Sequence, residues 1–323
     1  MYLRVKYAET ENGICVLRCY GYEQTLVIPD ELMGRPVTEL APYACSSSDP
    51  GDRWKKYEIQ ETVLHEEEKL PGEEQELAGE LLTEVYLPRH LKRIGTYAFY
   101  FCRQLKILHV QGELEDIEGG AFMWCKGLNR LIFRNIPWEN KVVYNVLSEF
   151  TQELEASLFF ADGTTLTLTF PEYYEESVEN TPARIIDTHW HGSGYKYRQC
   201  FPERKLDLGG YDRLFPYAVA NELPDTCLQL ALNRLKYPLS LTEEAAGQYR
   251  KFLADHGKEL VKRAVQKEDP DLLALMEEQG LLSEELTAFA TPYAAERGAA
   301  EVGSFLMDYR RRHSGRRKKT FEL

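Results

Sequence analysis

The chain has 323 residues and a formal net charge of −13, with 43% hydrophobic and 28% charged residues. This is the composition of an ordinary soluble globular protein with room for two or three domains. No run of 18 apolar residues occurs, so we expect no membrane-spanning helix. The opening residues, MYLRVKYAETENG, lack the apolar core of a signal peptide, and we therefore expect a cytoplasmic protein.

Residues 14–45 contain a strand that ends at Ile28-Pro29, followed by the segment GRPVTELAPYAC. In this segment Leu40-Ala41 and Ala44-Cys45 stand where Ile-Gly and Ala-Phe stand in repeats further along the chain. Terminal repeats depart from the pattern because they must cap the stack. We therefore interpret residues 14–45 as the first, degenerate coil of a repeat array.

An acidic insert at residues 46–80 interrupts the array, with many Glu residues and several Pro and Gly. Ala44 and Ala98 occupy equivalent places in the repeat and lie 54 positions apart, which is one period of 23 residues plus 31. We therefore expect one coil to be enlarged by the insert. Its composition predicts a solvated, mobile excursion, and the functional alternative is a loop that docks a basic partner.

The chain then repeats an apolar pattern with a period of 23 residues. Between IGTYAFYFCRQL and IEGGAFMWCKGL the shared residues are the pairs Ile94/Ile117, Ala98/Ala121, Phe99/Phe122, Cys102/Cys125 and Leu105/Leu128. Successive side chains of a strand point to opposite faces. The inward positions of the strands EVYLP, ILHVQ and RLIFR are therefore predicted to be Leu82/Leu105/Leu128, Val85/Leu108/Leu131 and Leu87/Val110/Phe133. The outward positions, which form the candidate interaction surface, are Glu84, Tyr86, Ile107, His109, Arg130 and Ile132.

Energetics require these coils to stack. One coil offers roughly seven inward groups, and each large one contributes about 1.5–3 kcal/mol when it is fully buried. Ordering one coil of 23 residues costs about 1–2 kcal/mol per residue in backbone entropy alone. A single coil is therefore unstable, and neighbouring coils must cover both of its open faces, as they do in a solenoid.

The segment LPRHLKRIGTYAFYFCRQLKILHV resembles the BspA-like leucine-rich repeat family, whose repeats read I-G-x-x-A-F-x-x-C-x-x-L before a strand and L/I-P. The resemblance covers residues 14–45 and 82–135. It implies a strand-rich solenoid with a protein-binding role in a bacterial protein. It assigns no functional residue, because all the residues that the family shares belong to the core.

The seven cysteines form no Cys-x-x-Cys pair. The repeat itself accounts for Cys102 and Cys125 as small buried side chains, so we expect reduced, structural thiols. A metal or redox pair formed by Cys15 and Cys19 is the alternative, although the sequence contains no second half for such a site.

Residues 141–213 are predicted to form a small antiparallel β unit that closes the C-terminal end of the solenoid. The stretch ASLFFADGTTLTLTFP alternates apolar residues with Thr around Asp162-Gly163, which is typical of a hairpin. The stretch PARIIDTHWHGSGYKYRQCF predicts one or two further strands and a Gly turn.

The motif IIDTHWHG places His189 and His191 on one face of a strand, as in the first strand of amidohydrolase-type barrels that bind a divalent metal. Such a barrel needs roughly 200 residues or more. Only 132 residues follow His191, and their pattern is mainly helical. We therefore expect an exposed strand face and no metal site, with a metal-dependent hydrolase that uses His189 and His191 as a remote alternative.

Residues 214–310 show the three- and four-residue apolar steps of helices. Helix starts are indicated by Ser240 or Thr242, by Asp269 before Pro270 and by Ser283, and a helix end by Gly280. A weaker period of 30 residues resembles stacked helical hairpins of the ankyrin kind, and a generic helical bundle is the alternative. The pairs with this spacing are Ala264/Ala294, Leu272/Val302, Leu275/Phe305 and Met276/Leu306.

Residues 311–323 are predicted to be a basic disordered tail. The run RRRHSGRRKK, residues 310–319, holds seven Arg or Lys. Clustered positive charge neutralises phosphates without sequence preference, so binding of a polyanion or a nucleic acid is an alternative function. A solvated tail is the plainer interpretation.

The sequence thus predicts an α+β chain. A leucine-rich-repeat solenoid is expected at residues 1–140, the β unit at 141–213, an ankyrin-like helical domain at 214–310 and the tail after it. No P-loop, dinucleotide-binding or nucleophile-elbow motif occurs. We predict a non-enzymatic protein–protein interaction or scaffold module with an unidentified protein partner and without a cofactor, a metal, a catalytic residue or membrane contact.

Overall fold

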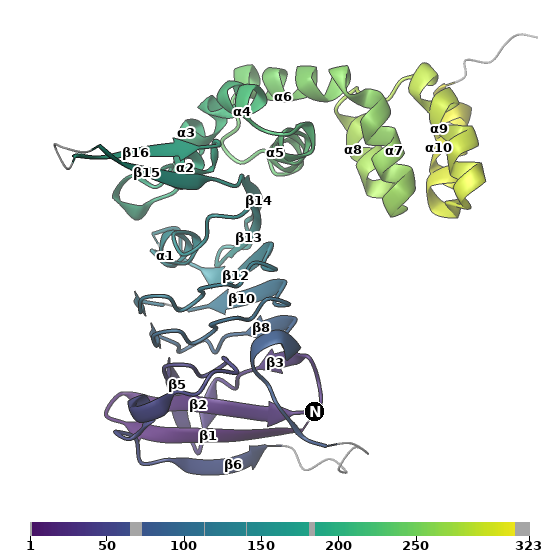
Figure 1. Cartoon of the computed structure of the whole chain (residues 1–323). Helices are drawn as coiled ribbons and strands as arrows, with labels where there is room; N and C mark the ends of the chain where they lie inside the picture. Colours follow the sequence, from purple (N-terminus) through teal and green to yellow (C-terminus); the bar gives the residue numbers. More distant parts are fainter. Residues whose placement is uncertain (1, 65–72, 113, 140, 181–184, 314–323) are drawn as a thin grey trace, which may run out of the picture. The chain divides into compact units, whose positions relative to one another are not determined.

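The computed structural model describes residues 2–64, 73–112, 114–139, 141–180 and 185–313 (Figure 1). The chain separates into two compact units, Met1–Thr226 and Cys227–Leu323.

The first unit begins with an antiparallel pair of strands, β1 (Leu3–Thr10) and β2 (Gly13–Gly21). One edge of β1 pairs with β6 (Gln60–Leu64), and β2 runs parallel to β5 (Arg35–Leu40) on the other side. Figure 1 shows this sheet at the N-terminal end of the stacked coils. Two short strands pair with β5 and β2 respectively, namely β4 (Glu31–Leu32) and β7 (Gln75–Glu76).

The stacked coils have a parallel sheet along each of two sides (Figure 1). One side continues from β5 through β9 (Arg93–Ile94) to β11 (Asp116–Ile117). The other side ends in an antiparallel strand, β14 (Thr165–Phe170). Its parallel strands are β3 (Thr25–Val27), β8 (Glu84–Tyr86), β10 (Ile107–Gln111), β12 (Arg130–Ile136) and β13 (Leu154–Phe160).

The repeated residues line the inside of the coils. All nine predicted inward positions are buried. The rings of Phe99 and Phe122 stack with centroids 5.0 Å apart and 4° between their planes. The Cys102 thiol donates to the carbonyl of Cys45 at 3.2 Å, and the Cys125 thiol donates to the carbonyl of Phe99 at 3.0 Å. Each cysteine therefore links its coil to the preceding one, and the prediction of a stacked core is confirmed.

The last coil is closed by a side chain that the repeat does not predict. After helix α1 (Val142–Leu147), the Gln152 amide donates to the main-chain carbonyls of Cys125 at 3.2 Å and Leu128 at 3.3 Å. Buried carbonyls need donors. Gln152 thus supplies the donor that the cysteine of another coil would otherwise supply.

The first coil and the acidic insert follow the predicted plan with one correction. Thr25 of β3 pairs directly with Glu84 of β8, so residues 14–45 contribute the first coil and the insert enlarges a single coil. The insert is not only a solvated excursion, because its strand β6 extends the sheet of β1 and its Trp54 indole donates to the Pro42 carbonyl at 2.8 Å. Two 3₁₀ helices flank it, η1 (Gly51–Trp54) and η2 (Gly79–Leu81). Residues 65–72 lie outside the described part.

The predicted hairpin around Asp162-Gly163 is confirmed as β13 and β14. Because β13 also runs parallel to β12, this hairpin continues the solenoid sheet. A second hairpin, β15 (Tyr174–Asn180) with β16 (Ile185–His191), forms a separate two-stranded sheet. Helical structure begins before the predicted residue 214. The first unit already contains α2 (Gly194–Arg198), η3 (Pro202–Arg204), α3 (Leu208–Arg213) and α4 (Phe215–Asn221).

The second unit is helical. The predicted N-caps are confirmed, since the side-chain oxygens of Thr242, Asp269 and Ser283 accept from main-chain amides of the first turns that follow them. Gly280 follows a helix with a left-handed φ of 70°. The helices are α5 (Pro224–Lys236), which begins just before the unit boundary, α6 (Glu243–Asp255), α7 (Gly257–Lys267), α8 (Pro270–Glu278), α9 (Glu284–Arg297) and α10 (Ala300–His313).

The last four helices form two stacked hairpins. Helix α7 packs against α9 and α8 against α10, which gives the predicted offset of 30 residues a physical meaning. Helix α10 continues to His313, so Arg311–His313 do not belong to a disordered tail. Arg312 pairs with Glu277 at 2.6 Å. Residues 314–323, most of the basic run, lie outside the described residues. Among the helices that are described, none has the length and apolar character to cross a membrane.

Candidate functional site

The six predicted surface residues lie together on the outward face of the sheet β3–β14, which we call the outer sheet face. Strand pairing places Glu84, Ile107 and Arg130 side by side in one row. It places Tyr86, His109 and Ile132 in the next row. The parallel register therefore brings the predicted ladder together from three consecutive coils.

His109 departs from the prediction, because its side chain is only 3% exposed. The ring of Tyr86 stacks on the imidazole with centroids 3.7 Å apart. His109 Nε2 lies 2.7 Å from Glu84 Oε1, and the Tyr86 hydroxyl donates to the same carboxylate oxygen at 2.9 Å. His109 thus points outward as expected but is covered by its neighbours, so it is a support for the surface and not a contact residue.

The hydrogen bonds determine the protonation state of His109. Since a carboxylate only accepts, Nε2 carries the proton and donates to Glu84. The buried Nδ1 has no hydrogen-bond partner in the described part of the chain. Burial lowers the pKa of His109 below its ordinary value, and the hydrogen bond to Glu84 opposes this effect. The imidazole is therefore neutral at neutral pH.

Apolar and charged side chains alternate over the rest of the outer sheet face. Val27 at one end and Phe159 at the other are 39% and 36% exposed. The Arg134 guanidinium lies 5.0 Å from the centroid of the Phe159 ring, and Arg130 pairs with Glu155 at 3.5 Å. Arg, aromatic and aliphatic side chains in this mixture are typical of protein-binding surfaces.

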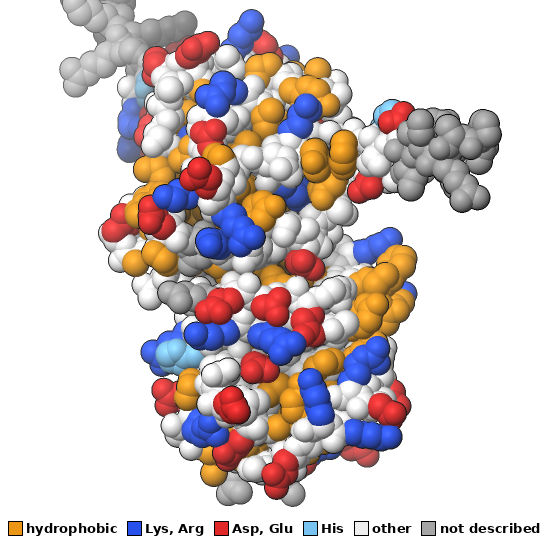
Figure 2. Space-filling model, turned by 90° about the vertical axis from the view of Figure 1, so that its left-hand side faces the viewer, with side chains coloured by type: hydrophobic (Ala, Val, Ile, Leu, Met, Phe, Trp, Pro, Cys, Tyr) orange, Lys and Arg blue, Asp and Glu red, His pale blue; other side chains and the backbone are white. Residues whose placement is uncertain are grey.

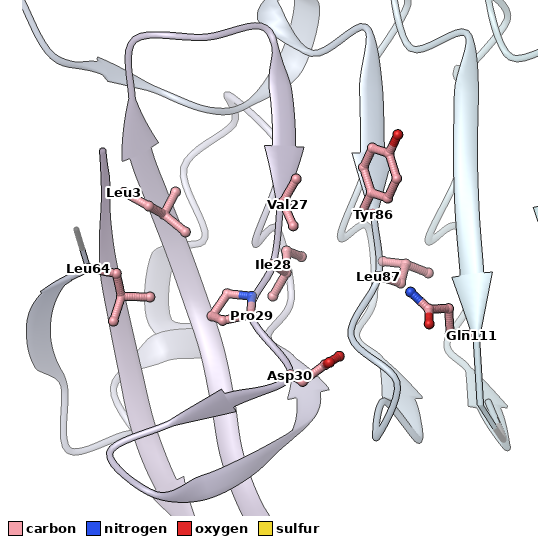
Figure 3. Close-up of a pocket in the computed structure, with 9 residues that line it drawn as sticks. All are labelled: Leu3, Val27, Ile28, Pro29, Asp30, Leu64, Tyr86, Leu87 and Gln111. Atoms are coloured by element: carbon pink, nitrogen blue, oxygen red, sulfur yellow. The ribbon is translucent and has the colours of Figure 1, made fainter. Parts of the chain in front are cut away.

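The outer sheet face ends in an apolar hollow of about 330 Å³ (Figure 3). Val27, Tyr86 and Gln111 line it from three neighbouring strands of the outer sheet face. Leu3 of β1 and Leu64 of β6 close the opposite wall, and Asp30 lies at one end. The acidic insert therefore contributes a wall of this hollow through β6.

Sequence reasoning missed Val27, Gln111, Arg134 and Phe159 as members of this surface. A signal existed for Val27, since aligning Ile28-Pro29 with Leu87-Pro88 places Val27 opposite Tyr86, as the register confirms. Phe159 had no such signal. The spacing between Arg134 and Phe159, which pair across β12 and β13, is 25 residues and breaks the period.

His189 and His191 lie on β16 and are at least partly open to solvent. His191 Nε2 lies 2.9 Å from Glu176 Oε2 and stacks on Tyr174, while His189 Nε2 lies 3.7 Å from Asp187 Oδ2. Within the described residues, no group of three or more His, Cys, Asp or Glu side chains could hold a metal ion. Each histidine is accounted for by a neighbour on its own hairpin.

Comparison with known proteins gives one match. Residues 74–152 match the family described as BspA type leucine rich repeat region (6 copies). No curated protein and no solved structure matches the chain. The matched segment contains β8, β10 and β12 with their coils, whereas the first coil at residues 14–45 lies outside it. Through residues 74–152, the chain belongs to the BspA-type leucine-rich repeat family.

Proposed function

We propose that the chain is a non-enzymatic interaction scaffold that binds a protein partner through the outer sheet face. The repeat family favours such a role, since a solenoid presents a broad extended surface. The observation that carries the proposal is the exposure of Val27 and Phe159 on a parallel sheet, because parallel sheets usually have both faces covered. A partner would supply the missing cover.

The thiols support a reducing, cytoplasmic location for this scaffold. All seven cysteines are free and buried. Burial raises the pKa of Cys15, Cys45 and Cys200 to about 12 in each case. The thiolate is the reactive form of cysteine, so these side chains act as small core groups. We propose no catalytic role for them.

The contact face can be tested by capture from the native host with two baits. The variant Ile132→Lys/Phe159→Ser changes the outer sheet face, and Met123→Lys/Trp124→Ser changes exposed apolar residues of the same unit that lie elsewhere. We expect the first variant to lose a protein that the unchanged chain and the second variant both retain, as measured by quantitative mass spectrometry. Equal recovery with all three baits would contradict the assignment of this face.

A further inference from the structure

A second candidate surface runs along the loops that follow β8, β10 and β12. Three hollows of about 440, 330 and 260 Å³ lie there, and Pro137 lines all three. We call this row of hollows the loop-edge groove. It is distinct from the outer sheet face, because no residue of that face lines it.

The described lining of the loop-edge groove reverses the charge of the chain as a whole. It contains only two acidic residues, Glu115 and Glu139, in a molecule with a net charge of −13. Lys92 pairs with Glu115 at 3.4 Å and Lys205 with Glu139 at 2.6 Å, so both acids are already paired. The six basic lining residues are Arg89, His90, Lys92, Lys141, Arg204 and Lys205.

A buried hydroxyl in the largest hollow independently indicates a missing hydrogen-bond acceptor. Thr38 lines this hollow beside Arg89, His90 and Lys92 and is only 4% exposed. Its Oγ1 is buried and has no hydrogen-bond partner in the described part of the chain. A buried hydroxyl without a partner is costly. A ligand carboxylate near the three basic side chains would accept its proton and remove this cost.

The smallest hollow has a different chemistry. The Trp138 indole, 45% exposed, stacks on Phe160 with centroids 3.8 Å apart. Leu158 and Phe201 complete its apolar wall. Trp138 is held in place by a hydrogen bond from its Nε1 to Asp162 at 2.8 Å. This end of the groove therefore accepts an aliphatic or aromatic side chain.

We propose that the loop-edge groove binds an extended acidic peptide segment of a partner protein. The carboxylates lie against Thr38, Arg89 and Lys92, and an apolar side chain of the same segment packs beside Trp138. Charge complementarity favours a negatively charged ligand. The apolar end favours a peptide over a nucleic acid, since a strand of nucleotides needs repeated stacking rings along a basic channel. Figure 2 shows Lys and Arg side chains beside a histidine at one edge of the face that it draws.

The test uses the full chain and a short fluorescein-labelled peptide of Glu and Asp around a central Leu. We expect saturable binding by fluorescence anisotropy that weakens as salt is added, because salt screens exposed charges. A peptide with Lys in place of every acid should not bind. Replacing the central Leu by Ser should weaken binding by about tenfold or more, because it removes the burial of one apolar side chain.

Two protein variants separate the groove from nonspecific charge. Lys92→Glu/Arg204→Glu should abolish binding, whereas Lys106→Glu/Lys126→Glu, with the same change of charge at exposed positions outside the groove, should retain most of it. Thr38→Val should weaken binding by about tenfold through loss of a hydrogen bond to a charged group. Its Tm without peptide should not fall, because the hydroxyl forms no bond in the free protein.

Tryptophan fluorescence locates the apolar side chain. Binding should shift the emission of the unchanged chain, and Trp138→Phe should bind without that shift. The proposal is overturned if the acidic peptide does not bind at low salt, if both charge-reversal variants lose affinity equally, or if Thr38→Val binds as well as the unchanged chain. Tighter binding of a labelled oligouridine than of the peptide would also overturn it, in favour of a nucleic acid. None of these outcomes depends on the outer sheet face, so failure here leaves the proposed function standing.

Discussion

The strand coils and the helical hairpins are both repeats, but they constrain their sequences differently. In the coils the backbone of one turn lies against the next, so Ala98 and Cys102 recur identically as Ala121 and Cys125, 23 residues later. In the hairpins the residues 30 apart are only similarly apolar, as Leu272 and Val302 show. Helices pack through side chains of many shapes. A strict repeat therefore reports close backbone contact, and a loose one reports only burial.

The largest effect that separates the two regions should come from Phe99→Ala. This change removes one ring of the buried Phe99–Phe122 stack and should lower the free energy of unfolding of the first unit by about 3–5 kcal/mol. Urea unfolding followed by hydrogen exchange measures the loss for each unit. Amides of α7–α10 should keep their protection. Met123→Ala, at an exposed position in the same array, should change stability by about 0.5 kcal/mol or less.

A smaller effect should come from the thiols that join the coils. Cys102→Ala removes the donor to the Cys45 carbonyl and should cost about 1–3 kcal/mol. Cys102→Ser restores a donor of similar size and should cost less. The same unfolding experiment compares the two variants. If Ala and Ser destabilise the first unit equally, the cysteine serves only to fill space and the proposed link between coils is wrong.

The helical hairpins can be weakened at a cap without any change to their core. Asp269 accepts from the Leu272 amide at 3.0 Å at the start of α8, and Asp269→Ala should cost about 1 kcal/mol. Asp269→Asn keeps an acceptor and should cost less, which makes it the matched control. Circular dichroism during thermal unfolding measures both. A loss confined to the first unit would contradict the independence of the two repeats.

The sequence predicts the coil core and the helix caps because each depends on local residue types at a fixed spacing. It does not predict that β6 joins β1, since QETVL is polar and its partner lies far away in the chain. Alternation along a strand tells which face His109 occupies, but only the register reveals that Tyr86 covers it. The loop-edge groove escapes prediction for a similar reason. Its Arg204 and Lys205 come from outside the repeat, so no periodicity links them to Arg89.

The smallest effect should be a pH dependence of the strand coils that the helical hairpins lack. The pKa of His109 is lowered in the folded chain by burial, so the unfolded chain binds the proton more readily as the pH falls below about 6.5. The stability due to neutral His109 is therefore complete above that pH and declines below it, until the folded form is protonated too. His109→Gln should reduce this decline between about pH 7 and 5, by less than the cap loss. Urea midpoints of the first unit at both pH values measure it. An unchanged decline in the variant would place the pH dependence on other groups.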